Sequence, residues 1–154
     1  MDRLSDAVAS LRPRRVTTAI DALTGEKHGF RSDLIADFYY GSRDRDFWRM
    51  GLYNVGDSDK IVFQKSLPLS SADNLRLGIY AGKPGLGYDR EFSSRLSGEL
   101  ELWNPNDHQL DMRLLYRLRP SVDLTIGAHE IFSGTDPFFG LRYHFGRPDR
   151  TDPD

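Results

Sequence analysis

The sequence predicts an all-β domain in which about ten antiparallel strands follow one another as an up-and-down meander, closed into a barrel. Two observations indicate this fold. From Val16 to Phe145, apolar and polar residues alternate with a period of two, which is typical of antiparallel strands with one apolar face. Clusters of turn-forming residues divide this alternation at short, regular intervals, as in a barrel or a sandwich. The length of 154 residues fits one domain.

The predicted strands follow in order along the chain. They are residues 16–23, 30–40, 47–53, 61–67, 75–79, 86–90, 96–102, 110–118, 122–128 and 139–145, of which 86–90 is the weakest. Several of the connections are rich in Gly, Asn, Asp, Ser or Pro, which favour turns: residues 24–26, 41–44, 54–57, 104–107 and 133–137.

The two ends of the chain differ from this pattern. Leu4, Ala7, Val8 and Leu11 recur at helical spacing, so residues 1–13 are expected to form a short amphipathic helix that Pro13 ends. This helix is either the end of a longer one or a cap on the β domain of residues 14–145. Residues 146–154 have nothing to bury and are expected to be disordered. The first residues lack the apolar core of a signal peptide.

Composition excludes several classes of protein. With 21 Lys and Arg against 23 Asp and Glu, the net charge of -2 gives no basic footprint for nucleic acid. A mean hydropathy of -0.55 and the lack of a long apolar run exclude a transmembrane helix, although not a transmembrane β-barrel. The absence of cysteine excludes disulfides, thiolate zinc sites and cysteine nucleophiles.

No motif predicts a metal or cofactor site. The four histidines fall in separate segments without ligand spacing and are expected to face solvent: His28, His108, His129 and His144. Asp57 and Asp59 lack the glycine and distal glutamate of an EF-hand loop. Residues 82–87 lack the order of a phosphate-binding loop and no helix follows them, so they are interpreted as a turn between strands.

No motif predicts an enzyme either. Glu99 and Glu101 lie two residues apart on one strand face, a spacing of about 7 Å that could suit glycoside hydrolysis. Arginines on the same face offer a simpler role, because they would pair with these carboxylates. No nucleophile elbow is present. We therefore expect no catalytic residue.

The apolar face of the strands is the candidate functional surface. Ten of its residues are the candidate lipid-contacting or core positions: Phe38, Trp48, Met50, Leu77, Leu100, Leu114, Tyr116, Ile126, Leu141 and Tyr143. Alternation alone does not decide whether this face points inward, as in a soluble barrel, or outward to lipid. The opposite face, with residues such as Arg31 and Asp33, suits a solvated exterior as well as an ion-paired lumen.

Three features favour an apolar face that meets lipid. The number of strands is even, and the last strand ends in an aromatic residue, Phe145. Aromatic residues lie near strand ends, where the girdles of membrane barrels form: Tyr39, Tyr40, Tyr53, Tyr80 and Trp103. Against this, several strands are shorter than the 9–11 residues of a tilted span, and a tail follows Phe145. On balance we expect a closed barrel that meets lipid.

The order of the motifs resembles the C-terminal β region of bacterial MCE (mammalian cell entry) proteins of the MlaD type. The motifs that carry the resemblance, within residues 4–145, include Gly29-Phe30-Arg31-Ser32-Asp33-Leu34, Phe38-Tyr39-Tyr40, Gly56-Asp57-Ser58-Asp59, Leu100-Glu101-Leu102-Trp103-Asn104-Pro105-Asn106 and Phe138-Phe139-Gly140-Leu141-Arg142-Tyr143-His144-Phe145. The chain lacks the anchoring helix and the MCE domain of that family, so no pore-lining residue can be carried over.

The resemblance implies a non-enzymatic part in phospholipid transport across a bacterial envelope, in the periplasm or the outer membrane. Its partners would be lipid or a membrane and the ABC permease and ATPase of such a system; the oligomeric state and the lipid are left open. The alternatives are an independent, porin-like outer-membrane barrel, a soluble lipocalin-like binder of an apolar ligand and, last, a carbohydrate-active enzyme that uses Glu99 and Glu101.

Overall fold

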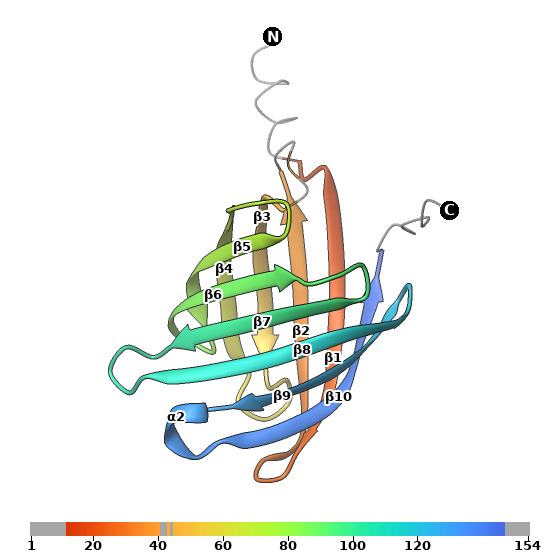
Figure 1. The fold of residues 1–154 in the computed structure, drawn as a ribbon. Coiled ribbons are helices and arrows are strands. Elements are labelled where there is room, and N and C mark those ends of the chain that lie inside the picture. Colours follow the sequence, from red (N-terminus) through yellow and green to blue (C-terminus); the bar gives the residue numbers. More distant parts are fainter. Residues whose placement is uncertain (1–11, 41–42, 44, 147–154) are drawn as a thin grey trace.

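Ten antiparallel strands form one closed sheet in the computed structural model, which describes residues 12–40, 43 and 45–146 (Figure 1). The strands are β1 (Arg15–Gly25), β2 (Gly29–Tyr39), β3 (Phe47–Tyr53), β4 (Lys60–Pro68), β5 (Asp73–Tyr80), β6 (Lys83–Glu91), β7 (Leu96–Trp103), β8 (Gln109–Arg119), β9 (Val122–His129) and β10 (Asp136–Phe145). A short helix, α2 (Ile131–Gly134), lies between β9 and β10. The predicted meander and its closure into a barrel are confirmed.

Closure comes from the pairing of the first strand with the last. β1 pairs with β2 on one side and with β10 on the other, where Thr18 lies opposite Phe145 and Gly25 opposite Phe138. The other strands pair with their neighbours in sequence. We call the end at which β1 begins and β10 ends the open end. The opposite end, with the turns 54–59, 81–82 and 104–108, is the sealed end.

Two connections differ from the sequence-based expectation. Residues 83–85, expected in a turn before the predicted strand 86–90, are the first residues of β6, and the turn consists of Ala81 and Gly82, with φ of 49° and 76°. Two left-handed residues in succession make a tight hairpin turn whose twist matches that of its strands. The second difference is α2, which occupies part of the turn expected at 133–137.

The expected helix of residues 1–13 and the expected tail of residues 146–154 lie outside the described residues, apart from Arg12, Pro13 and Gly146.

The two faces of the strands separate apolar from polar side chains. Along β8, Asp111 and Arg113 are buried, whereas Met112, Leu114 and Tyr116 are exposed. The same division holds around the barrel, whose buried charged and polar side chains outnumber its buried apolar ones. The apolar face therefore points outward and the polar face lines the lumen, the opposite of a soluble barrel.

Inward-facing glycines allow neighbouring strands to approach each other closely. A Cβ on Gly140 would lie 2.0 Å from the carbonyl oxygen of Ala22, and a Cβ on Gly78, at φ 147°, would lie 2.2 Å from that of Phe63. Both distances are too short for any side chain. These strands therefore require glycine at the two positions where the backbones meet.

Candidate functional site

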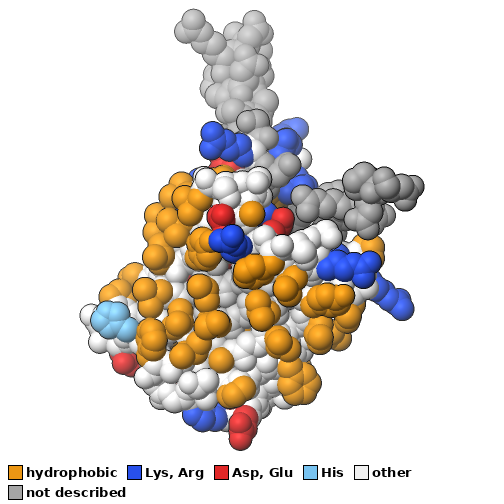
Figure 2. Space-filling view, viewed as in Figure 1, with side chains coloured by type: hydrophobic (Ala, Val, Ile, Leu, Met, Phe, Trp, Pro, Cys, Tyr) orange, Lys and Arg blue, Asp and Glu red, His pale blue; other side chains and the backbone are white. Residues whose placement is uncertain are grey.

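The ten residues predicted for the apolar face all lie on the outside of the barrel. Eight of them are 37–49% exposed, and Phe38 and Leu100 are half-buried. Their neighbours across the strands are apolar as well, since Ile126 lies between Leu114 and Phe139 in the register of β8, β9 and β10. Figure 2 shows hydrophobic side chains spread over one side of the barrel wall. The exterior thus carries a continuous apolar surface rather than isolated apolar residues.

Three of the aromatic residues expected in an outer girdle lie inside the barrel instead. Tyr53, Tyr80 and Trp103 are 6–8% exposed and pack against one another in the lumen. The reason is their position in the alternation, because Trp103 shares the inward parity of Glu101. Outward aromatic residues do lie near both ends: Trp48, Tyr116, Tyr143 and Phe145 toward the open end, and Phe30, Phe132 and Phe139 toward the sealed end.

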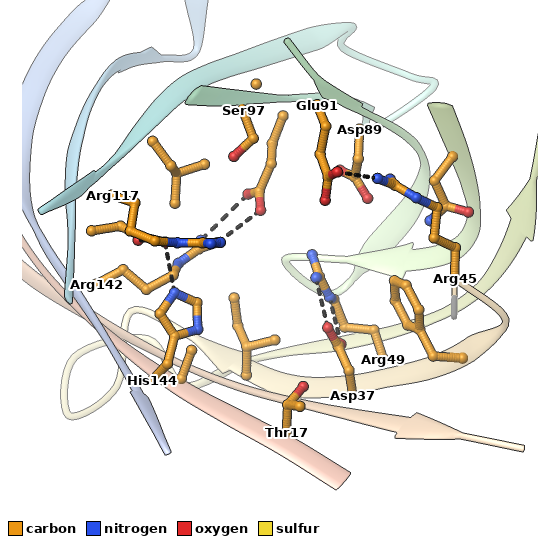
Figure 3. Close-up of a pocket in the computed structure, with 18 of the residues that line it drawn as sticks. Thr17, Asp37, Arg45, Arg49, Asp89, Glu91, Ser97, Arg117, Arg142 and His144 are labelled. Atoms are coloured by element: carbon orange, nitrogen blue, oxygen red, sulfur yellow. Dashed lines mark hydrogen bonds and ion pairs between the residues drawn. The ribbon is translucent and has the colours of Figure 1, made fainter. Parts of the chain in front are cut away.

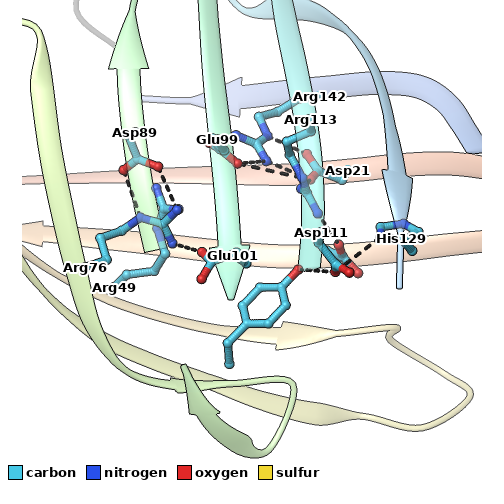
Figure 4. A network of polar contacts seen from close by, with 12 residues as sticks. Asp21, Arg49, Arg76, Asp89, Glu99, Glu101, Asp111, Arg113, His129 and Arg142 are labelled. Carbon is cyan, nitrogen blue, oxygen red and sulfur yellow. Dashed lines mark hydrogen bonds and ion pairs between the residues drawn. The ribbon is translucent and has the colours of Figure 1, made fainter. Parts of the chain in front are cut away.

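Ion pairs cross the middle of the lumen and link strands that are far apart in sequence (Figure 4). Asp21 of β1, which is fully buried, accepts hydrogen bonds from Arg113 at 2.7 Å and from Arg142 at 2.6 and 2.9 Å. Arg142 also donates to both oxygens of Glu99, at 2.7 and 3.3 Å. Each charge in this group has a partner, which is the condition for holding charges away from water.

A second group of ion pairs lies beside the first. Arg76 donates to both oxygens of Asp89, at 2.8 and 2.6 Å, and to Glu101 and Gln64. Its guanidinium lies over Gly87, where a Cβ would come within 2.7 Å of the Arg76 Cζ atom. A glycine at this position therefore makes room for the arginine.

Aromatic packing fills the sealed end of the lumen. The ring centroids of Tyr53, Tyr80 and Trp103 lie 5.4–6.5 Å apart. The hydroxyl of Tyr80 donates to Asp111 at 3.1 Å, and the guanidinium of Arg31 stacks on the ring of Tyr53 at 3.6 Å. The lumen is thus occupied by side chains at this end.

The open end contains a cavity of about 580 Å³ (Figure 3). Its lining includes Arg49, which donates to both oxygens of Asp37 at 2.8 and 2.9 Å, and His144, which lies 2.7 Å from Asp123. Arg45 pairs with Glu91 at 2.7 Å. A second cavity, deeper in the lumen between Arg49, Arg113 and the sealed-end tyrosines, measures about 20 Å³. The side chains therefore leave much more space at the open end than deeper in the lumen.

The arginines that line this cavity were not among the predicted site residues. Their inward direction follows from parity, because Arg117 shares the face of Arg113 and Arg15 shares the face of Asp21. Sequence reasoning placed several such residues on a polar face. It did not identify a cavity, because the volume depends on which side chains meet across the lumen.

Glu99 and Glu101 lie in the lumen rather than in solvent. Glu99 accepts hydrogen bonds from Arg142, and Glu101 from Arg76 and Gln64. The pairing with arginine that the sequence suggested is therefore present in the structure.

Two histidines contradict the expectation that they face solvent. His129 is 5% exposed and stacks on Phe138 with ring centroids 4.0 Å apart, and the side chain of His144 is 15% exposed in the lumen. Both histidines stand at positions of the strand alternation that face the lumen. Among the described residues, no group of three or more histidine or carboxylate side chains is arranged to hold a metal ion.

No helix within the described ranges combines the length and the apolar character that a membrane span requires.

Comparison with known proteins gives one structural likeness. No family model and no curated protein matches the sequence, so the resemblance to MCE proteins has no family match behind it. A solved structure described as "De novo design of transmembrane beta-barrels" is similar with a TM-score of 0.43 and 14% sequence identity, over 87% of this chain and 98% of that one. The function must be argued from the residues of this chain.

Proposed function

We propose that this chain is a small β-barrel that inserts into a lipid bilayer and serves there as a membrane anchor without catalysing a reaction. The observation that carries the proposal is the inversion of the usual pattern of burial. Leu114, Ile126 and Leu141 are 41–49% exposed, whereas Asp21 and Arg76 are at most 1% exposed.

Water is a poor solvent for such a surface. Soluble proteins rarely expose contiguous apolar patches larger than a few hundred Å², and here the apolar rows continue from strand to strand. In a bilayer the same rows would contact acyl chains, and the closed sheet would leave no backbone edge unpaired in the hydrocarbon. This supports insertion over the lipocalin-like alternative, which needs an apolar lumen.

The lumen argues for an anchor rather than a porin-like channel. Arg113 and Arg142 meet carboxylates across its middle, and Trp103 fills part of the sealed end. A solute that entered the open end would have to displace these side chains to pass.

A role without catalysis agrees with the contacts of the two glutamates considered as catalytic candidates. Glu99 and Glu101 are each held by an arginine, so neither is arranged as a general acid beside a free carboxylate.

The finer proposal is that the anchored system transports phospholipid in a bacterial envelope. It is supported by the resemblance of the motif order between residues 4 and 145 to the β region of MCE proteins. In that case the barrel would hold the transporter at the outer membrane, and the ABC permease and ATPase would be its partners. Co-purification of these subunits with the tagged chain from its native cells tests this finer form.

Insertion is tested by comparing three proteins: the wild type, Leu114→Arg and a matched surface change, Lys60→Gln. We expect the wild type to need detergent for a monodisperse state and to fold into phosphatidylcholine vesicles with β-type circular dichroism. Leu114→Arg should lower the stability of the inserted state by about 2–4 kcal/mol, because its charge would face lipid near mid-strand. Lys60→Gln should leave it unchanged.

A wild type that is monodisperse without detergent and unable to enter vesicles would refute insertion. In planar bilayers the inserted protein should show no steady conductance, and stable open-channel currents would favour the porin-like alternative over a closed anchor.

A further inference from the structure

We infer that the cavity at the open end of the lumen is a binding site for a phosphate group. Among the described residues that line it, eight arginines face five carboxylates, and two further carboxylates, Asp21 and Asp73, pair with Arg142 and Arg90 from outside the lining. Arginines therefore outnumber the carboxylates in and beside the cavity, within a barrel whose outer wall is apolar. A water-filled recess with an unbalanced positive charge concentrates anions.

The arginines in the floor of the cavity already form ion pairs with carboxylates. Arg49 is held by both oxygens of Asp37, and Arg142 by Asp21 and Glu99. The excess charge therefore belongs to the arginines nearer the open end.

In two of these arginines, one N–H group has no hydrogen-bond acceptor. The Nε atoms of Arg15 and Arg117 are buried and make no hydrogen bond. Arg15 stacks on the ring of Tyr39 at 4.0 Å, and Arg117 forms an ion pair with Asp123 in which its Nε atom lies 3.9 Å from the carboxylate, too far for a hydrogen bond. A buried donor without a partner is costly, and an anion in the cavity would supply the acceptor.

Two more arginines, Arg95 and Arg119, line the same cavity and are exposed. Within the described part of the chain, no carboxylate forms an ion pair with either of them.

Phosphate is the anion that this arrangement fits. The planar guanidinium donates two parallel hydrogen bonds to phosphate oxygens, and several arginines can share one tetrahedral group. A cavity of about 580 Å³ lies in the size range of sites for small organic ligands, so it has room for a phosphate ester as well as for the free ion. The ester could be a soluble compound or the headgroup of a lipid.

The site goes beyond the anchoring role and does not depend on it. It lies in the lumen, away from the outer face that would contact lipid, so a failure to bind phosphate would leave membrane insertion untouched.

The experiment uses the full chain in neutral detergent micelles with ¹⁵N-labelled arginine. The Nε–H resonances of Arg15 and Arg117 are assigned from their loss in Arg15→Gln and Arg117→Gln. Inorganic phosphate, glycerol 3-phosphate and phosphatidylglycerol are then titrated in turn, with sodium chloride at equal ionic strength as the reference. We expect both resonances to shift in a saturable way with a phosphate compound and not with chloride.

Arg117→Gln should weaken this binding about tenfold, because it removes charge-assisted hydrogen bonds to the ligand. Arg43→Gln, at the same end but outside the cavity lining, should leave it unchanged. Circular dichroism shows whether each variant is folded, and Arg117→Lys, which keeps the charge, provides a second variant with an intermediate affinity.

Saturation by glycerol 3-phosphate would identify a soluble ester as the source, and saturation by phosphatidylglycerol alone would identify a lipid headgroup; either result supports the site. Equal shifts with phosphate and chloride, or equal weakening by Arg43→Gln and Arg117→Gln, would overturn it.

Discussion

Inward-facing residues line both ends of the lumen, but the two ends differ in the kind of side chain that lines them. At the sealed end, Tyr53, Tyr80 and Trp103 pack ring against ring and leave little volume. At the open end, arginines and carboxylates surround a cavity of about 580 Å³. The difference shows that a barrel of this size can be filled by apolar rings or lined by charges. Between the two ends, the ion pairs of Arg113 and Arg142 form a middle layer that separates the aromatic packing from the cavity.

The largest effect is expected from the layer that separates the two ends. Arg113→Leu leaves Asp21, which is fully buried, with one of its two arginine partners. Removing one member of a buried ion pair costs about 3–5 kcal/mol. Urea unfolding of the barrel in micelles measures this loss, with Arg43→Gln as the control. A loss below about 1 kcal/mol would mean that water reaches Asp21 and that the middle layer is not closed.

Trp103→Ala at the sealed end should cost about 3 kcal/mol, the low end for a buried aromatic residue, because the indole N–H of Trp103 donates no hydrogen bond. The same urea titration measures it. We also expect the variant to remain non-conducting in planar bilayers, since the ion pairs of the middle layer are left in place. Conductance in this variant would show that the aromatic packing alone closes the lumen.

The equivalent change at the open end should be milder. Tyr39 is half-buried, stacks under Arg15 at 4.0 Å and lies 5.2 Å from the ring of Phe47. Tyr39→Ala is expected to cost about 1 kcal/mol, since the ring borders the cavity and is less buried than that of Trp103. A cost equal to that of Trp103→Ala would remove the contrast between the two ends.

The smallest effect is expected at the rim of the cavity. Arg119→Gln removes an exposed charge and should change stability by less than about 0.5 kcal/mol. If this change stabilised the barrel by 1 kcal/mol or more, repulsion among the rim arginines would be a larger force than the structure indicates.

Much of the fold could be predicted from the sequence because the strands are regular. All ten alternating segments are strands, and even the weak segment at 86–90 lies within β6. The helix α2 was missed, since its four residues, with Ser133 outside helical geometry, give no helical period. Residues 83–85 were missed as strand because Pro84 and Gly85 are poor strand formers; the strand forms because its neighbours supply the hydrogen bonds.

The candidate site was predicted in part. The ten apolar-face residues share one side of the barrel, as their parity required. Tyr53, Tyr80 and Trp103 were expected in a girdle because they lie near strand ends, but their places in the alternation are those of the polar, inward face. The contacts that define the lumen could not be predicted, because Asp21 and Arg142 are 121 positions apart and meet only after closure.

The sequence by itself determined that each strand has one apolar and one polar face, because a period of two sorts side chains to opposite sides of a sheet. It did not determine which face is inside, since a closed sheet of alternating strands has the same pattern with either face inward. The tertiary structure decided this. Arginines and carboxylates from distant strands can satisfy one another within the lumen, and glycines such as Gly140 leave room where the strands approach each other closely. The apolar side chains were thereby left on the outside, the arrangement that the proposed insertion into a bilayer requires.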